Sequence, residues 1–260
     1  MNASTTVFMA RGPVAFFTIN RPEAGNAMTW AMYDALVAAC EQVDATPDVR
    51  VFVIRAAGAT FCPGTDISQF TAFSTREDGV EYERRLEACV SRIERVGVPT
   101  LAQVEGIAAG GGCAIALACD LRVCSPSARF GVPIARTLGN GLSFENCARL
   151  VEHFGMPRAR AMLITGRFID AAEAAASGVI THLAEPADVA REVDELAAAI
   201  LRNAPLTMRA AKQALNRLAA QRRQDAGEVA DLVADCYASA DFREGVASFL
   251  AKRPPTFTGR

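Results

Sequence analysis

Three consecutive glycines, Gly110, Gly111 and Gly112, are suited to binding a negatively charged oxygen through the backbone. They stand directly before an apolar run, residues 113–119, whose good helix formers predict a buried helix. Glycine has no Cβ, so a ligand can lie against the bare backbone. The first N–H groups of a helix lack intrahelical acceptors, and the helix dipole favours negative charge beside them. Taken alone, this stretch fits either an oxyanion site or a glycine turn that binds nothing.

The elements around this turn follow an alternating pattern. Short apolar runs predict buried strands at 14–19, 51–54, 100–104, 121–124 and 128–132. Helical spacing predicts helices at 29–43, with Thr29 as N-cap, and at about 78–96. This alternation predicts an α/β fold for the first two thirds. After about Val189 the pattern becomes helical, at 196–201, 206–218, 229–237 and 242–250. We therefore predict a core of residues 1–195 and a helical region of residues 196–260.

Composition excludes several classes of function. The chain has 260 residues, 51% of them hydrophobic, which is ample for a sizeable core. The net charge of -2 gives no electrostatic reason to expect nucleic acid or an anionic membrane as partner. No apolar run reaches the length of a membrane span. The eight cysteines form no C-x-x-C pair and no Cys/His cluster at metal spacing. We therefore expect no metal site, reduced thiols and a cytoplasmic location.

With these pieces placed, five segments together resemble the crotonase superfamily, also called the enoyl-CoA hydratase/isomerase family. The resemblance covers nearly the whole chain, and its specificity comes from the order and spacing of the segments. They are NRPEAGNAM (20–28), FCPGTDI (61–67), IAAGGGCAIALACDLRVCS (107–125), ITGRFIDAAEAAASGVI (164–180) and EGVASFLAKRPPTF (244–257).

This resemblance implies a spiral of ββα turns with a helical C-terminal trimerisation region. It implies a homotrimer or a dimer of trimers. The substrates would be acyl groups held as coenzyme A thioesters, with coenzyme A part of the substrate and no tightly bound cofactor. The shared chemistry is stabilisation of a thioester enolate by two backbone N–H groups, which match Thr65 and Gly111 here. Thr65 departs from the small residue usual at its position, but its backbone N–H is retained.

The resemblance also implies where an acyl-CoA is contacted. The matching positions lie in four segments, namely the first two segments of the resemblance, the glycine turn and the closing motif. They are Glu23, Ala24, Gly25, Thr65, Asp66, Ile67, Ser68, Gly111, Phe249 and Lys252. In the family the closing motif reaches the coenzyme A of a neighbouring subunit, and a lysine there suits a phosphate.

The two glutamates of the family's hydratases are replaced here. The corresponding positions are Ala114 and Ile134. Adding water across a double bond needs a proton donor and acceptor within hydrogen-bond reach, and neither side chain supplies one. Glu145 is the only carboxylate in the loop 135–146. It fits either a catalytic base or a first-turn helix acid after Ser143 as N-cap.

Three hypotheses follow from these residues. The first is an acyl-CoA enzyme of the hydratase/isomerase type that stabilises a thioester enolate but hydrates simple enoyl-CoA poorly. The second is an isomerase, decarboxylase or thioesterase of an unusual acyl-CoA that uses Glu145. The third is an acyl-CoA-binding protein without catalysis. Cys62, beside the second loop, would be a poor nucleophile, because no neighbour in sequence lowers its pKa.

Overall fold

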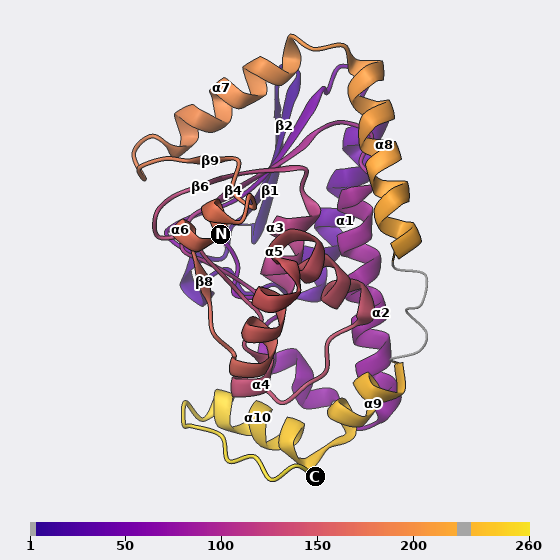
Figure 1. The fold of residues 1–260 in the computed structure, drawn as a ribbon, viewed down its shortest axis with the longest axis vertical. Coiled ribbons are helices and arrows are strands. Elements are labelled where there is room, and N and C mark those ends of the chain that lie inside the picture. Colours follow the sequence, from indigo (N-terminus) through magenta and orange to yellow (C-terminus); the bar gives the residue numbers. More distant parts are fainter. Residues whose placement is uncertain (1–3, 223–229) are drawn as a thin grey trace.

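The computed structural model describes residues 4–222 and 230–260, which form two sheets surrounded by helices (Figure 1). The larger sheet has six strands in the order β1-β2-β3-β4-β6-β9. Its strands are β1 (Thr6–Arg11), β2 (Val14–Ile19), β3 (Val51–Ala56), β4 (Thr100–Val104), β6 (Leu121–Cys124) and β9 (His182–Leu183). The β1–β2 pair is antiparallel and every other pair in this sheet is parallel.

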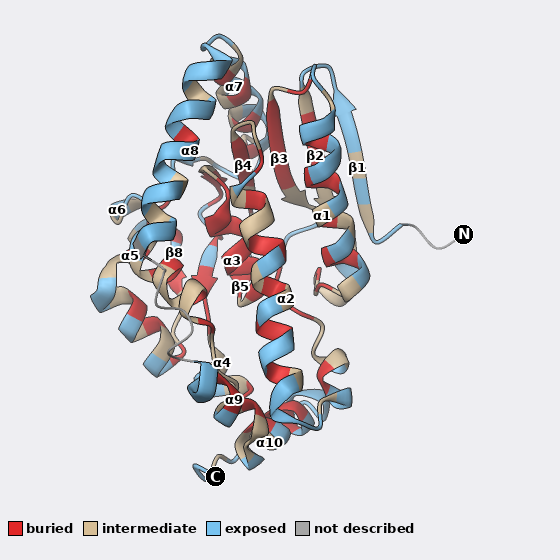
Figure 2. Cartoon of the chain, turned by 90° about the vertical axis from the view of Figure 1, so that its right-hand side faces the viewer, coloured by how far each residue is buried: buried red, intermediate tan, exposed pale blue. Residues whose placement is uncertain are grey.

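Both faces of the larger sheet are covered. Side chains alternate between the faces along a strand, so neighbouring residues enter different cores. Phe17 packs with α1 (Trp30–Ala45), α2 (Arg76–Glu94) and α3 (Gly111–Ala118). Phe16 packs instead with α7 (Val189–Leu201) on the other face. Figure 2 shows the consequence, with β3 and β4 buried between helices and β1 exposed at the edge.

The smaller sheet holds the glycine turn in place. Its strands are β5 (Ile107–Ala109), β7 (Arg129–Gly131) and β8 (Ile169–Asp170), in that order. β4 leads into β5 and then α3, and β6 leads into β7 and then α4 (Ile134–Thr137). This repetition of two strands and a helix is the ββα spiral that the resemblance implies. It brings the starts of α3 and α4 to the same region of the molecule.

The remaining helices surround this core. They are η1 (Pro22–Ala24), η2 (Ile67–Ala72), α5 (Phe144–Thr165), α6 (Ala171–Ala176), α8 (Pro205–Arg222), α9 (Ala230–Ala238) and α10 (Ala240–Leu250). α9 and α10 lie at the opposite end of the molecule from α7 (Figure 1). They pack on α2 and η2 through an aromatic cluster of Phe70, Phe73, Tyr82, Tyr237 and Phe242. None of the helices in the described ranges is both long and apolar enough to cross a bilayer.

Most predicted elements are confirmed within a few residues, and the differences have clear causes. The predicted glycine-led helix is α3, whose residues are all buried. Four strands were not predicted. The hydrophobic pattern of β1 is hidden by its exposure at the sheet edge, and β5, β8 and β9 have only two or three residues each. The predicted boundary after residue 195 falls inside α7, which packs on the sheet. Val229, the predicted start of the next-to-last helix, lies outside the described residues.

Arg122 fixes the C-terminal end of α3. Its guanidinium is buried and donates to the carbonyl oxygens of Cys119 (2.6 Å), Val179 (2.6 Å) and Asp120 (3.1 Å). The last carbonyls of a helix have no intrahelical donor, so these bonds satisfy groups that would otherwise be buried without partners. Arg122 therefore ties α3 to β6 and to the segment before β9.

We expect Arg122→Met to lower the free energy of unfolding by about 3 kcal/mol, because several buried carbonyls would lose their donor. Urea unfolding of the variant and the parent protein measures this. The matched control is Arg84→Met, since Arg84 is exposed and pairs only with Glu81 among the described residues. A loss for Arg122→Met no larger than that of the control would show that Arg122 does not anchor α3.

Candidate active site

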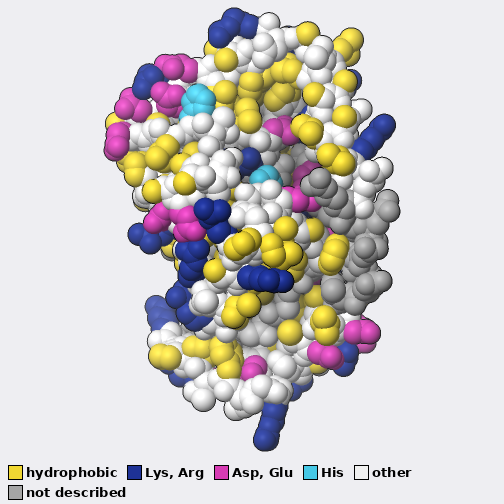
Figure 3. All heavy atoms as spheres, viewed as in Figure 1, with side chains coloured by type: hydrophobic (Ala, Val, Ile, Leu, Met, Phe, Trp, Pro, Cys, Tyr) yellow, Lys and Arg dark blue, Asp and Glu magenta, His cyan; other side chains and the backbone are white. Residues whose placement is uncertain are grey.

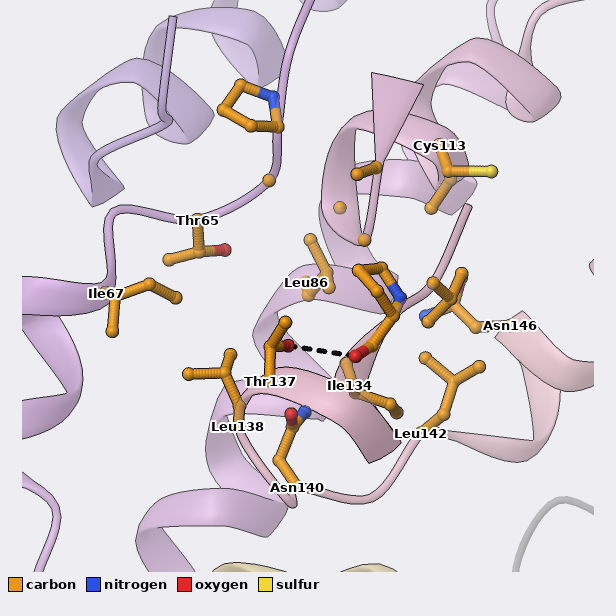
Figure 4. A pocket seen from close by; sticks show the side chains of 18 of the residues that line it. Thr65, Ile67, Leu86, Cys113, Ile134, Thr137, Leu138, Asn140, Leu142 and Asn146 are labelled. Atoms are coloured by element: carbon orange, nitrogen blue, oxygen red, sulfur yellow. Dashed lines mark hydrogen bonds between the residues drawn. The ribbon is translucent and has the colours of Figure 1, made fainter. Parts of the chain in front are cut away.

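A cavity of about 490 Å³ opens where the glycine turn, α2, α4 and the start of α5 meet. Its wall is mainly apolar (Figure 4). In that view Thr65 and Ile67 lie on one side, Cys113 and Asn146 on the other, and Asn140 below. A mainly apolar cavity with a few polar groups is the usual form of a small-molecule site.

The free backbone N–H groups on this wall include those of Thr65 and Gly111, which come from two different segments. Thr65 and Gly111 both line the cavity, and neither N–H has an acceptor within the described part of the chain. The Met28 N–H donates to the Gly64 oxygen and the Met28 oxygen accepts from the Asp66 N–H, both at 2.8 Å. The Thr65 N–H between them therefore points away from Met28. Gly111 begins α3, so its N–H has no intrahelical acceptor.

The loop that carries Thr65 is held directly against the glycine turn. Cys62 donates its N–H to the Ile107 oxygen (2.8 Å) and accepts from the Ala109 N–H (2.9 Å). A Cβ on Gly112 would overlap the Cys62 carbonyl, and a Cβ on Gly111 would lie 2.5 Å from the Tyr33 hydroxyl oxygen. Only glycine allows this close approach at both positions.

A buried cluster of hydroxyl groups supports the Thr65 loop from behind. The Thr65 Oγ1 lies 2.8 Å from the Tyr33 hydroxyl and 2.9 Å from the Tyr82 hydroxyl. Burial raises the pKa of both tyrosines well above the ordinary value, so both stay protonated. Two hydrogen bonds thus fix the Thr65 side chain and, with it, the direction of the Thr65 N–H.

Glu83 of α2 is a buried carboxylic residue that lines the cavity and also a second, smaller depression. The residue is only 5% exposed. Its Oε1 accepts from the Tyr237 hydroxyl (2.9 Å), and its Oε2 accepts from the Ser143 N–H (3.0 Å). Burial raises the pKa of Glu83 to about 7, although these hydrogen bonds lower it in part. Both protonation states are therefore populated near neutral pH.

Asn140 and Arg149 add polar groups to the same wall. The Asn140 Nδ2 donates to the Tyr237 hydroxyl (3.1 Å), whereas its Oδ1 is buried and has no hydrogen-bond partner among the described residues. Arg149 is 1% exposed and pairs with Glu87 (3.0 Å) and Glu94 (2.9 Å). These two carboxylates outweigh the effect of burial and raise the pKa of Arg149, so its charge persists.

Ala114 and Ile134 both line the cavity, and both are apolar. Glu145 lies elsewhere: it lines a separate depression with Glu87 and Ser143 and is absent from the cavity wall. Its position after the Ser143 N-cap is confirmed, since the Ser143 Oγ accepts from the Asn146 N–H. A catalytic role for Glu145 stays a prediction, and the geometry gives it no direct access to the cavity.

The predicted acyl-CoA contacts fall into two groups. One group lines the cavity: Ala24, Thr65, Asp66, Ile67, Gly111 and Phe249. The other lies outside the wall: Glu23, Gly25, Ser68 and Lys252. Phe249 of α10 lines the cavity of its own chain. Partial burial raises the pKa of Asp66, but hydrogen bonds from Arg21 and Ser68 lower it more, so Asp66 is a structural carboxylate.

Cys62 is fully buried, and its Sγ faces the Gly64 oxygen at 3.8 Å. Burial raises the pKa of this thiol to about 12. A thiol that stays protonated is a weak nucleophile, which confirms the expectation drawn from sequence.

Sequence reasoning missed Glu83 and Tyr237. The signal for Glu83 was its place on the apolar stripe of α2, where Gly79, Leu86, Val90 and Ile93 are also buried. A carboxylate at helical spacing within such a stripe is a candidate for a function. Tyr237 gave no comparable signal, because it is 154 residues away from Glu83 in the chain.

Comparison with known proteins agrees with this fold. The model of the enoyl-CoA hydratase/isomerase family matches residues 10–260. A short-chain-enoyl-CoA hydratase of Clostridium acetobutylicum is 30% identical over 257 residues, covering 97% of each chain. An enoyl-CoA isomerase/hydratase of Mycosarcoma maydis is 33% identical over 261 residues, covering 95% of this chain and 93% of the relative.

A solved structure shows the same fold. The crystal structure of an enoyl-CoA hydratase from Mycobacterium avium subsp. paratuberculosis superposes with a TM-score of 0.85. It is 28% identical and covers 98% of this chain and 99% of its own. The family match, the sequence identity to relatives and the similarity of fold all extend over almost the full length of the chain. The chain therefore belongs to the enoyl-CoA hydratase/isomerase family of the crotonase superfamily.

Proposed function

We propose that this protein binds acyl-CoA thioesters and stabilises their enolates between the N–H groups of Thr65 and Gly111. The observation that carries the proposal is the pair of free N–H groups on the wall of one cavity. Fixed donors aimed at a developing negative charge act strongly in a site that excludes water. The α3 dipole adds to this effect at Gly111.

The apolar side chains of Ala114 and Ile134 argue against hydration as the reaction. Family hydratases place glutamates at these two positions, and both positions face the cavity here. Without a donor and an acceptor there, a water molecule is neither activated nor oriented by these residues. The site retains the means to form an enolate, which suits isomerisation and related proton transfers.

Acyl-CoA binding without turnover remains the rival hypothesis, and Glu145-dependent isomerisation, decarboxylation or thioester hydrolysis is another. An enzyme that uses Glu145 would need this side chain to reach the acyl group. Glu145 lines the separate depression and not the cavity in which the acyl group would lie. We favour an enolate-forming enzyme because the residues that line the cavity include a different glutamate, Glu83.

The coenzyme A portion would lie along η1 and the start of η2, with Phe249 and Lys252 of the closing motif nearby. Ala24 and Ile67 line the cavity from these two elements. Figure 3 shows Lys and Arg side chains gathered on the edge near α6 and β8, beside a hollow. Cationic side chains at such an edge suit the phosphates of coenzyme A.

All eight cysteines are free, which supports a reducing, cytoplasmic setting.

The experiment that tests the function is exchange of α-protons of saturated acyl-CoA thioesters in heavy water, followed by mass spectrometry. We expect deuterium at the α-carbon of at least one thioester that binds. Binding without exchange for every thioester would favour the non-catalytic rival. Absence of binding would contradict both hypotheses.

We expect Gly111→Ala to reduce α-proton exchange about 10²-fold, because a Cβ there displaces the N–H at the start of α3. The clash is with the Tyr33 hydroxyl oxygen, 2.5 Å from the Cβ position, whereas the ring carbon Cζ lies 3.6 Å away. Adding Tyr33→Phe should therefore raise the activity to that of Tyr33→Phe alone, the control, which itself lacks one of the two hydrogen bonds to the Thr65 Oγ1. A double variant as slow as Gly111→Ala would show that the Tyr33 hydroxyl is not the cause of the loss.

We expect hydration of crotonyl-CoA by the protein to be at least about 10²-fold slower than its fastest α-proton exchange, since two acid–base groups are missing. Loss of absorbance of the enoyl thioester measures hydration. The double variant Ala114→Glu, Ile134→Glu should gain hydratase activity if the rest of the site is intact. Efficient hydration by the unmodified protein would overturn the role given to Ala114 and Ile134.

We also propose that the chain forms a trimer or a dimer of trimers. Apolar side chains are exposed around α5 and α8 (Figure 3), and Ile164 (76%), Leu206 (76%) and Leu215 (66%) are largely exposed. Groups of exposed apolar side chains are typical of protein interfaces.

Light scattering should give three or six times the chain mass of 27.6 kDa. Leu215→Asp should shift the mass downwards, because a charge would be buried in the interface. A mass of one chain for the unmodified protein at micromolar concentration would contradict the proposed assembly.

A further inference from the structure

Glu83 differs from the other carboxylate on the cavity wall. The carboxyl groups lining the described cavity belong to Asp66 and Glu83. Asp66 is held in an ion pair with Arg21 (2.6 Å) and caps η2 through the Ser68 N–H. Glu83 has only uncharged partners, the Tyr237 hydroxyl and the Ser143 N–H, in the described ranges. Glu83 is therefore the carboxyl group on this wall that is not committed to a cation.

The α2 helix that carries Glu83 also packs against the residues that supply the two free N–H groups. Leu86 follows Glu83 by three residues, and its Cδ1 lies 3.4 Å from the Cβ position of Gly111. Residues three apart on a helix share one face. Tyr82, directly before Glu83, contacts the Thr65 Oγ1 at 2.9 Å. The neighbours of Glu83 on α2 thus contact both residues that supply the N–H groups.

We propose that Glu83 is the catalytic residue that moves the proton when a bound 3-enoyl-CoA thioester, the substrate class of the family's isomerases, is converted to a 2-enoyl-CoA. This inference rests on the proposed enolate chemistry. The Glu83 carboxylate removes the α-proton, and the C–H electron pair moves into a dienolate whose charge lies on the thioester oxygen. The carboxyl group then returns the same proton to the γ-carbon, and the double bond shifts by one position. The reaction needs one carboxyl group and no water or co-reactant.

The surroundings of Glu83 suit both steps. Burial raises the pKa of Glu83 to about 7, so it is a base strong enough to accept a proton and an acid able to return it near neutral pH. Glu87, one turn further along α2, raises it as well. Tyr82, Cys147 and Tyr237 stay neutral, because burial raises the pKa of each.

The charged groups of α5 are placed differently. Arg149 is occupied by Glu87 and Glu94. Glu145 lies in the depression behind Glu83, on the side away from the main cavity. No cation among these described neighbours pairs with Glu83, which keeps its proton affinity high.

Two contacts hold the carboxyl group in one orientation. The Ser143 N–H comes from the turn before α5, and the Tyr237 hydroxyl comes from α9. Tyr237 is itself fixed by the Asn140 Nδ2. A positioned base needs this kind of support, because its geometry decides the rate of proton transfer.

The test compares Glu83→Gln with two other glutamine variants, using 3-hexenoyl-CoA isomerisation and hexanoyl-CoA α-proton exchange. Glu81→Gln is the matched control, since the Glu81 side chain is 59% exposed on the same helix. Glu145→Gln tests the rival carboxylate. We expect Glu83→Gln to slow both reactions by about 10²-fold or more, with hexanoyl-CoA affinity unchanged, and Glu81→Gln to match the parent.

The outcomes separate this inference from the proposed function. Isomerisation and exchange that survive Glu83→Gln, or that are lost in Glu145→Gln instead, would overturn the role of Glu83 while leaving the enolate chemistry intact. A parent protein that binds hexanoyl-CoA without exchange, and leaves 3-hexenoyl-CoA unchanged, would overturn both.

The pH profile gives a second readout that a purely structural Glu83 would not change. The rate of isomerisation should rise with pH through a pKa near 7, as the base form of Glu83 becomes populated. Tyr237→Phe removes a donor to the carboxylate, which disfavours the charged form and raises the pKa. We expect its profile to move to higher pH. An unchanged midpoint would contradict the assignment even if Glu83→Gln failed to fold.

Discussion

The site depends on one backbone contact, that between the loop 62–65 and the glycine turn. Cys62 pairs with β5 on one side of the contact, and Met28 pairs with Gly64 and Asp66 on the other. These bonds use the N–H and C=O groups on either side of Thr65 and leave the Thr65 N–H free. The absence of side chains at Gly111 and Gly112 brings the start of α3 to the same place. The two segments thus bring the free N–H groups of Thr65 and Gly111 to the wall of one cavity.

The polar groups of the cavity are distributed unevenly. The α3 and α4 side presents Ala114 and Ile134, which cannot exchange protons, whereas α2 presents Glu83. The C-terminal helices belong to this arrangement, because Tyr237 of α9 holds Glu83 and Phe249 of α10 closes part of the wall. An aromatic cluster between η2, α2 and these helices keeps them there. A shift of α9 would therefore move the Tyr237 hydroxyl that donates to the Glu83 carboxyl group.

Much of this fold was predictable from the sequence, because the central strands and the buried helix α3 are continuous apolar runs. The glycine turn was recognisable from residues 110–112, since three glycines directly before an apolar run predict a tight turn that leads into a helix. Its partner Thr65 was not derivable from spacing and came from the resemblance. Glu83 looked like one charge among many on α2, because periodicity alone does not show which face of a helix lines a cavity. The contacts of Glu83 with Tyr237 and Ser143 join distant segments, which local patterns do not encode.

The proposed enolate chemistry requires two backbone donors to polarise a bound thioester carbonyl. Infrared difference spectroscopy tests it most directly, using hexanoyl-CoA with a carbon-13 label at the thioester carbonyl. We predict that the carbonyl stretch moves to lower frequency when the thioester binds, because hydrogen bonds from Thr65 and Gly111 weaken the C=O bond. A stretch at the frequency of the free thioester in water, for a ligand that is demonstrably bound, would contradict the proposed chemistry.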